Sequence, residues 1–379
     1  MNRRNFTCGI ACASLGFALG FAELKWIALS AGGAAQQEKT VDQTRKNIQA
    51  LKGLPESQLF LVMNVVGDSL GVHCDYCHVK NGTDPQTGRD NWLWESDDKQ
   101  KKTVARQMMK MVLDINKTNF GGAQTITCYS CHRGETSVAS VVPLPPRNFA
   151  EARPDEKKAA QSTAEQILNK YIASVGGESA VAKFKTLVMK GTLERSQGRS
   201  DSLEITLKAP DKYLVKLTTG QGVITQCIKG TDGWVSSASG LRQLGGDTLV
   251  QLKRVAALYG VIKFTEKPAQ MNVMGVEMIG DREAYVIAIE IDPNRAKRLF
   301  FDTRTGLLLR EITMTTTMLA PLPEQVDFED YRDVDGVNLP FTIRSSNAAA
   351  FDTAIRRFTE MRLNAPVDDA IFNRPAAPK

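Results

Sequence analysis

The sequence predicts an α+β protein in which an all-α N-terminal domain precedes a mostly antiparallel β-sheet or open-barrel domain with a few helices. Apolar residues recur with a helical period up to about residue 120, and with a period of two between turn signals beyond about residue 200. The length of 379 residues predicts two to three domains. A composition of 42% hydrophobic and 24% charged residues excludes a disordered chain and a polytopic membrane protein. The net charge of +6 is too small for an electrostatic nucleic-acid binder.

Residues 1–35 have the pattern of a secretory signal peptide. Arg3 and Arg4 precede an uncharged run at residues 5–22, and small residues follow at positions 30–35. A retained membrane anchor is the alternative, because the uncharged run is at the lower limit for a membrane span. We therefore expect a periplasmic protein, either released or held at the membrane by an uncleaved N-terminal segment.

The remainder divides at a proline-rich stretch. Residues 142–158 have the composition of a linker. We expect residues 36–141 to form the all-α domain and residues 159–379 to form the β-rich domain.

Two copies of a C-x-x-C-H pattern lie in the N-terminal domain. The first copy is Cys74, Cys77 and His78, and the second is Cys128, Cys131 and His132. This pattern is the attachment signature of c-type haem, in which two thiols bond the porphyrin edge and the histidine binds the iron. The chain has only three histidines and seven cysteines, so two such copies are unlikely to arise by chance. The sequence predicts two covalently bound haem c groups.

Zinc binding, disulfide formation and thioredoxin-like redox chemistry account for these cysteines less well. Zinc sites built from two C-x-x-C pairs usually have about 15–20 residues between the pairs, far fewer than separate Cys77 from Cys128. Structural disulfides suit an exported protein but give no reason for a histidine after each pair. A thioredoxin-like redox pair needs a βαβ context, which the pattern does not show.

A methionine-bearing helix is predicted before each C-x-x-C-H copy. The first runs from about residue 55 to Leu70 and contains Met63, with Gly71 as its C-terminal stop. The second has candidate N-caps at residues 96–98 and apolar residues at 104, 108, 111, 112 and 115. Periodicity does not choose among Met108, Met109 and Met111 as the second axial ligand. His73 adjoins a haem-bonded cysteine, so we interpret it as a surface neighbour rather than a ligand.

Residues of about 45–135 resemble the cytochrome subunit of photosynthetic reaction centres. The matching stretches are residues 47–51 (NIQAL), 68–72 (DSLGV), 104–108 (VARQM) and 127–134 (TCYSCHRG). The resemblance implies that Met63 and Met108 are the distal iron ligands. The family pattern has four haems and this chain has two C-x-x-C-H copies, so it resembles half of the four-haem arrangement.

Iron ligated by both histidine and methionine is closed to small molecules. We therefore expect a one-electron carrier, and not an enzyme, with a redox-protein donor and a membrane-associated acceptor such as a reaction centre or a respiratory complex. One alternative is a peroxidase-like haem oxidoreductase with an open iron site. The other is a carrier of an apolar ligand or lipoprotein in which the haems are accessory.

The C-terminal half shows no catalytic constellation. A capping box at residues 162–165 predicts a helix that ends at residues 176–177, followed by strands around Ile205, Val215 and Ile287 and a helix at about residues 247–259. Cys227 lies in an apolar run and is predicted to be a buried thiol. Residues 331–341 weakly resemble the closing strands of lipoprotein-carrier-like exported domains, which implies a curved sheet wrapped on helices and an apolar ligand.

Overall fold

The computed structural model describes most of the chain beyond the predicted signal segment. The described residues are 38–83, 90–138, 162–182, 185–195, 200–238, 240–244, 271–292, 295–347 and 353–375, with the single positions 198, 249 and 252. Residues Lys39–Lys379 fall in one compact unit. The predicted leader and linker lie outside the described residues, as does the predicted helix at 247–259 apart from Leu249 and Leu252. Among the described helices, none is long and apolar enough to cross a membrane.

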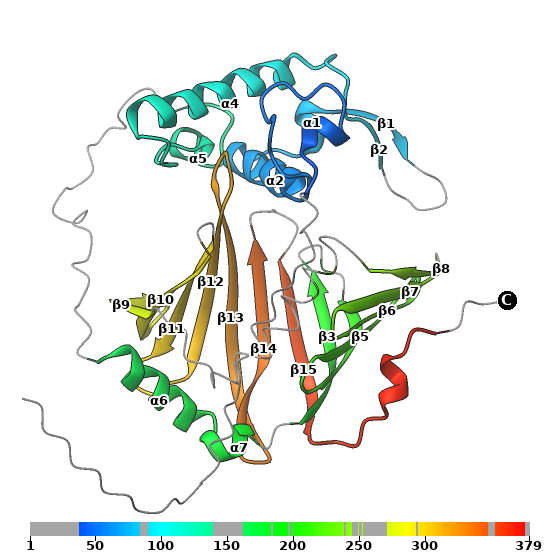
Figure 1. Ribbon diagram of the computed structural model, residues 1–379, viewed down its shortest axis with the longest axis vertical. Helices are drawn as coiled ribbons and strands as arrows, with labels where there is room; N and C mark the ends of the chain where they lie inside the picture. The colour runs from blue at the N-terminus through cyan, green and yellow to red at the C-terminus, as the bar shows by residue number, and fades with distance from the viewer. Residues whose placement is uncertain are drawn as a thin grey trace, which may run out of the picture. The chain divides into compact units, whose positions relative to one another are not determined.

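The N-terminal region, residues 38–138, is mainly helical (Figure 1). Its elements are α1 (Val41–Thr44), the 3₁₀ turn η1 (Glu56–Gln58), α2 (Leu59–Leu70), α3 (Cys74–Cys77), β1 (Val79–Thr83), β2 (Asp90–Leu93), α4 (Gln100–Asn119) and α5 (Cys128–His132). Strands β1 and β2 pair antiparallel. The expectation that this region is all-α is therefore not confirmed.

The two long helices form where periodicity predicts them, although their ends differ in detail. Gly71 ends α2 in the left-handed conformation, with φ of 66°, as expected for a glycine stop. The N-cap of α4 is Lys99, not one of residues 96–98. Asp97 instead forms ion pairs with Lys102 and Arg106 inside the helix, which removes it from a capping role.

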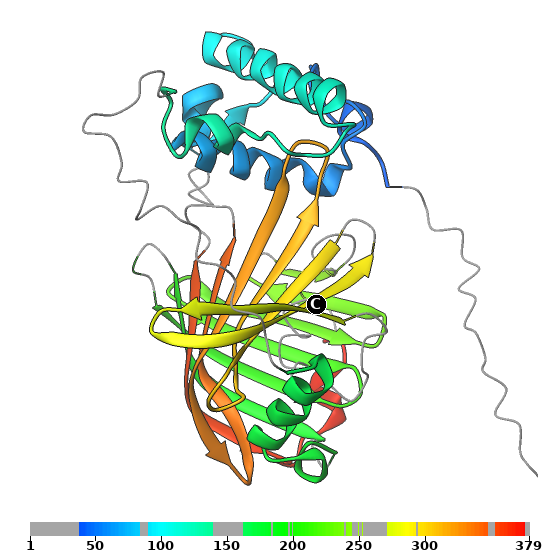
Figure 2. The same ribbon diagram turned by 90° about the vertical axis from the view of Figure 1, so that its left-hand side faces the viewer.

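The C-terminal region is built on one antiparallel sheet of 13 strands, in the order β8-β7-β6-β5-β4-β3-β15-β14-β13-β12-β11-β10-β9 (Figures 1 and 2). The strands are β3 (Thr186–Arg195), β4 (Ser200–Lys208), β5 (Lys212–Thr219), β6 (Gly222–Lys229), β7 (Asp232–Ser237), β8 (Gly240–Gln243), β9 (Met271–Ile279), β10 (Arg282–Asp292), β11 (Arg295–Asp302), β12 (Leu308–Thr316), β13 (Pro321–Val334), β14 (Val337–Asn347) and β15 (Ala354–Leu363). The helices are α6 (Ala164–Ser174), α7 (Glu178–Ala182) and the 3₁₀ turn η3 (Asp369–Phe372). The α+β class with a mostly antiparallel sheet is confirmed.

The main core of this region lies between one face of the sheet and helix α6. Ile167, Leu168, Tyr171 and Val175 are each at most 2% exposed and pack against alternate residues of the strands. The capping box of α6 is present but uses Thr163 and Gln166, one residue later than predicted. The sheet curves around this helix (Figure 2).

The segment at residues 331–341 forms the turn between β13 and β14 and also holds the end of α6. Asp335 and Gly336 make the turn with positive φ angles. Asn338 then donates from its side chain to the carbonyl of Ser174 at 2.7 Å and from its backbone to Val175 at 3.2 Å. Because these bonds satisfy C-terminal carbonyls of α6, the motif joins the last turn of the helix to the sheet.

Candidate haem-binding site

The first C-x-x-C-H copy follows directly from the end of α2. After the left-handed turn at Gly71, the chain enters the single helical turn α3, which places Cys74 and Cys77 three positions apart on one side. The backbone N–H of His78 donates to the carbonyl of Cys74 at 2.8 Å, which closes this turn. Both thiols are unpaired; Cys74 is exposed and Cys77 is half-buried. His73 is exposed at the N-cap of α3.

The second copy is held by hydrogen bonds from the chain that precedes it. Thr127 caps α5 in a capping box with Ser130, whose hydroxyl accepts from the N–H of Thr127 at 3.0 Å. Asn116, on α4 and 5% exposed, donates to the carbonyl of Ile126 at 2.7 Å and accepts from its N–H at 2.9 Å. This pair of bonds fixes the loop that leads into Cys128.

The two imidazoles have different surroundings, and each suits iron ligation. His132 Nδ1 lies 2.9 Å from the carbonyl oxygen of Glu135, so a proton on Nδ1 leaves Nε2 open to bind a metal. His78 packs edge-on against Trp94, with ring centroids 5.0 Å apart. Burial, followed by the charges of Lys102 and Arg106, lowers the pKa of His78 and keeps the ring neutral, the form that ligates iron.

One thiol of each copy has a raised pKa. Burial raises the pKa of Cys77, and the nearby Lys101 and Lys99 partly offset that rise. Burial likewise raises the pKa of Cys128. Lys101 also lies over the ring of Tyr76, 3.7 Å from its centroid.

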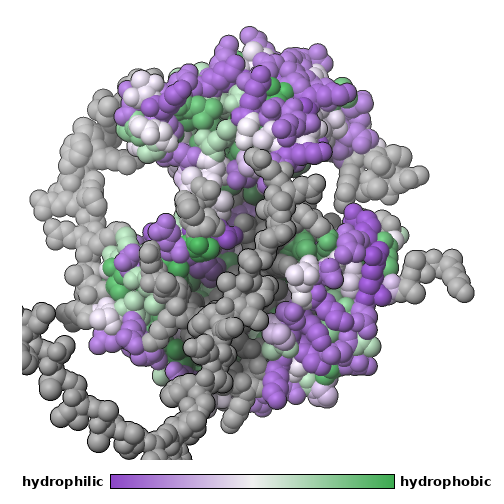
Figure 3. Space-filling model, in the orientation of Figure 1, coloured by the Kyte–Doolittle hydropathy of each residue, from purple (hydrophilic) through white to green (hydrophobic). Residues whose placement is uncertain are grey.

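Helix α4 carries two distinct apolar surfaces. Met109 and Val112 are buried in the core of the N-terminal region, at 7% and 5% exposure. Val104, Met108 and Met111 form a second stripe that is exposed, with 41% exposure at Met108. Hydrophobic patches are visible over the helices of this region, within mainly hydrophilic surroundings (Figure 3). Val104, Met108 and Met111 of the predicted stripe thus form a surface able to cover a porphyrin, whereas Val112 of that stripe belongs to the buried core. Met63 on α2 is half-buried.

The two C-x-x-C-H turns interlock with each other's preceding helix. Helix α2 packs against α5, and α3 packs against α4. At the end of α2, the N–H of Gly134 donates to the carbonyl of Ser69 at 2.9 Å. A Cβ atom on Gly71 would lie only 2.1 Å from the carbonyl oxygen of Gly134, so this glycine permits the close backbone approach.

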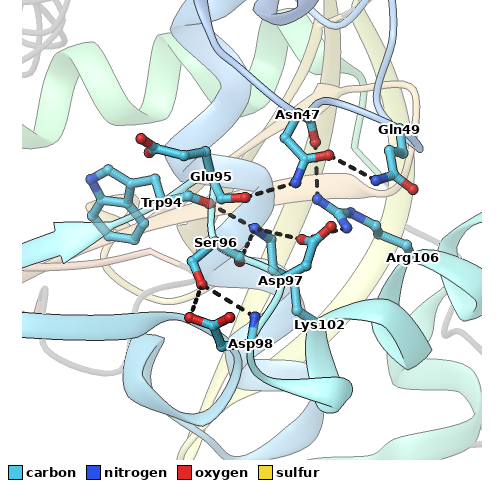
Figure 4. A network of polar contacts seen from close by, with 9 residues as sticks. All are labelled: Asn47, Gln49, Trp94, Glu95, Ser96, Asp97, Asp98, Lys102 and Arg106. Carbon is cyan, nitrogen blue, oxygen red and sulfur yellow. Dashed lines mark hydrogen bonds and ion pairs between the residues drawn. The ribbon is translucent and has the colours of Figure 1, made fainter.

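A polar network that sequence reasoning missed joins residues 94–98 to Lys102 and Arg106 of α4 (Figure 4). Its Trp94 is the residue whose ring packs against His78. The Lys102 ammonium, on a residue only 7% exposed, donates to the carbonyls of Trp94 at 2.7 Å and Ser96 at 2.6 Å. Arg106 donates to Asp97 at 2.7 Å and to the Asn47 carbonyl at 2.9 Å. Hydrogen bonds from Asn47, Arg106 and Lys102 lower the pKa of Asp97 to about 2. The signal for this network was Lys102 and Arg106 at i and i+4, with an aspartate upstream.

In the sheet region, Cys227 is fully buried, as predicted. Its Sγ lies 3.4 Å from the carbonyl oxygen of Phe372, and burial raises the pKa of the thiol to about 11. A buried thiol with a raised pKa is a poor nucleophile. Within the described residues, no group of three or more His, Cys, Asp and Glu side chains is placed to hold a metal ion.

Comparison with known proteins confirms the resemblance of the N-terminal part. Residues 21–184 match the family model of the photosynthetic reaction centre cytochrome C subunit. The photosynthetic reaction center cytochrome c subunit of Rubrivivax gelatinosus is 30% identical over 112 residues, which is 29% of this chain and 23% of that protein. The chain thus spans about a quarter of that relative's length. All eight predicted haem residues lie inside the range matched by the family model.

Comparison with solved structures finds distant likenesses that cover just over half of this chain. A DUF1329 family protein from Desulfovibrio piger aligns at 13% identity and a TM-score of 0.41, covering 55% of this chain and 96% of that one. A LolA superfamily protein from Nitrosomonas europaea aligns at 15% identity and a TM-score of 0.39, covering 56% and 98%. A putative outer membrane lipoprotein-sorting protein domain from Vibrio parahaemolyticus aligns at 11% identity and a TM-score of 0.40, covering 55% and 95%. With TM-scores below 0.5, these likenesses carry no functional conclusion.

Proposed function

We propose that this protein is an exported electron carrier that binds two haem c groups in its N-terminal region. One observation carries the proposal. Each C-x-x-C-H turn has unpaired thiols and a histidine suited to iron, and the exposed apolar stripe of α4 lies on the helix that packs against α3. A stripe of this kind gains stabilisation when a flat apolar group covers it.

Each C-x-x-C-H copy would hold one of the two haems. Cys74 and Cys77 would attach the first haem through thioether bonds, with His78 as proximal ligand. Cys128, Cys131 and His132 would do the same for the second haem. A haem iron supplies reversible one-electron exchange between its ferric and ferrous states.

The distal ligands in this proposal are Met63 and Met108. Methionine ligation favours the reduced iron and excludes small molecules from it. The Nδ1 contact of His132 with Glu135 would fix the ring that binds the second iron, while Trp94 would pack the ring that binds the first. The protein would then relay electrons without binding a substrate at iron.

The experiment uses the full chain expressed with a c-type haem maturation system. We expect a six-coordinate spectrum with a sulfur-to-iron charge-transfer band in the ferric state and no binding of carbon monoxide in the ferrous state. Rapid carbon monoxide or peroxide binding at either haem would overturn the relay and favour the peroxidase-like alternative. Lipid that co-purifies with the C-terminal region would favour the apolar-ligand carrier with accessory haems.

We further propose that the protein acts in the periplasm, released or held at the membrane by residues 1–35. There it would take electrons from a redox protein and pass them to a membrane-associated acceptor, such as a reaction centre or a respiratory complex. The support is the leader-like composition of residues 1–35 and the match to a reaction-centre cytochrome family. Fractionation of cells that express the chain tests the location, and recovery in the cytoplasm would contradict it.

A further inference from the structure

The hairpin tip between β12 and β13 is buried. Thr317, Leu319 and Ala320 are 4%, 1% and 3% exposed. The tip is also ordered internally, because the Thr317 hydroxyl donates to the Ala320 carbonyl at 2.7 Å and accepts from the N–H groups of Leu319 and Ala320 at 3.3 and 3.2 Å. Connections between strands usually run over the surface, so a buried tip requires a surface that covers it.

That surface belongs to the N-terminal region. Leu319 lies in one buried cluster with Val41, Leu51, Leu54, Val62, Met109 and Val112. Ala320 and Leu322 form a second cluster with Val65 of α2, and Leu61 packs against it. The main core of the sheet region contains none of these residues. The sheet region therefore completes a core made mostly by the helices.

The contact includes the helix that carries the predicted distal ligand of the first haem. Met63 and Met318 both pack against the cluster that contains Leu319. Leu61 and Val65 lie one turn apart on the face of α2 that packs in the cluster of Ala320 and Leu322, whereas Val62 and Met63 pack in the cluster of Leu319. The hairpin therefore packs with two faces of the helix, one of which includes Met63. A displaced hairpin would change the packing of α2 at the position where its methionine must meet iron.

We propose that the hairpin tip at residues 317–322 is a positioning element of the haem-binding region, which holds α2 so that Met63 ligates the first iron. This inference rests on the proposed function and deepens it. The C-terminal region then affects the first haem, because a partner that displaces β12 or β13 also shifts the helix that carries Met63. Met108, the predicted ligand of the second haem, lies on the exposed stripe of α4 and packs against neither cluster. Met109 and Val112 of the same helix do lie in the cluster of Leu319, so we expect the hairpin to act on Met63 directly and on Met108 only through α4.

The test compares two leucine truncations in the intact, haem-loaded chain. Leu319→Ala removes side-chain volume from the hairpin contact, and Leu299→Ala removes the same volume from a fully buried site in β11. We expect Leu319→Ala to lose half of the sulfur-to-iron charge-transfer absorbance and to bind carbon monoxide at one ferrous haem. Leu299→Ala should be less stable overall while keeping the full band and excluding carbon monoxide. Leu319→Met, which nearly conserves the volume, should restore both properties.

A full band and unchanged carbon monoxide exclusion in Leu319→Ala would overturn the proposal, as would equal losses in both truncation variants. If Leu319→Ala fails to fold, the milder Leu319→Val is tested instead, by its charge-transfer absorbance and its carbon monoxide binding. Hydrogen exchange of the α2 amides provides a second readout that needs no haem. Faster exchange in Leu319→Ala than in Leu299→Ala supports the hairpin contact. A wild-type chain without covalent haem would contradict the proposed function and leave this exchange comparison intact.

Discussion

Replacing Gly71 with alanine perturbs the junction between the two C-x-x-C-H turns. Alanine at φ of 66° lowers the free energy of unfolding by about 1–2 kcal/mol, because its Cβ is crowded in the left-handed conformation. The added Cβ would lie 2.1 Å from the Gly134 carbonyl oxygen, so the two backbones must separate by about 0.9 Å to reach even 3.0 Å. That movement weakens the bond from Gly134 to Ser69, worth about 0.5–1.5 kcal/mol, and adds packing strain of about 1–3 kcal/mol. We expect a total loss of about 3–5 kcal/mol in the free energy of unfolding.

Gly121 supplies a matched control. It follows α4 with φ of 59°, and a Cβ there meets nothing within 4 Å. Gly121→Ala should therefore cost only the conformational part, about 1–2 kcal/mol. Urea unfolding of both variants measures the difference. If the two alanine variants lose the same free energy, the close backbone approach between the turns does not exist and the interlocked arrangement is wrong.

Three further predictions concern the loop, the ion pairs and the second iron. Asn116→Ala should lose about 1–3 kcal/mol of stability and reduce haem loading at the second site, while Asn119→Ala, with one exposed bond, should change neither; urea unfolding and haem absorbance check this. The pKa of Asp97 is lowered to about 2, so its stabilising effect is present above about pH 4 and disappears as the pH falls toward 2. Asp97→Asn should flatten the stability profile in that window, and an unchanged profile would contradict the network. Met108→Ala should open the second iron to carbon monoxide, while Met111→Ala, equally exposed on the same stripe, should not.

The two long helices of the N-terminal region were predictable because their signals are local. The apolar period before each C-x-x-C-H copy and the glycine at position 71 placed α2 and most of α4 correctly. What periodicity did not reveal is that α4 has two apolar surfaces. The sequence pattern of a stripe that faces solvent or a cofactor resembles that of a core stripe, so Met109 was not separated from Met108.

The contacts that hold the site together were not predictable, because they join residues distant in the chain or depend on side-chain choice. Asp97 had the position of a helix cap, yet two cations within the first turns of α4 compete for its carboxylate. Leu319 meets α2 across more than 200 residues of sequence, and no local pattern encodes such a pairing. The alternating strands were predictable individually, while the order of 13 strands in one sheet came only from the structure.

The central claim is that each C-x-x-C-H turn holds its own haem, and the covalent haem content of the purified chain tests it most directly. The intact mass of the denatured protein should exceed that of the polypeptide by two haem groups. It should fall to one haem in the double variant Cys128→Ala and Cys131→Ala. A wild-type mass equal to that of the polypeptide alone would contradict the claim. So would a mass with one haem in the wild type and also one haem in the double variant.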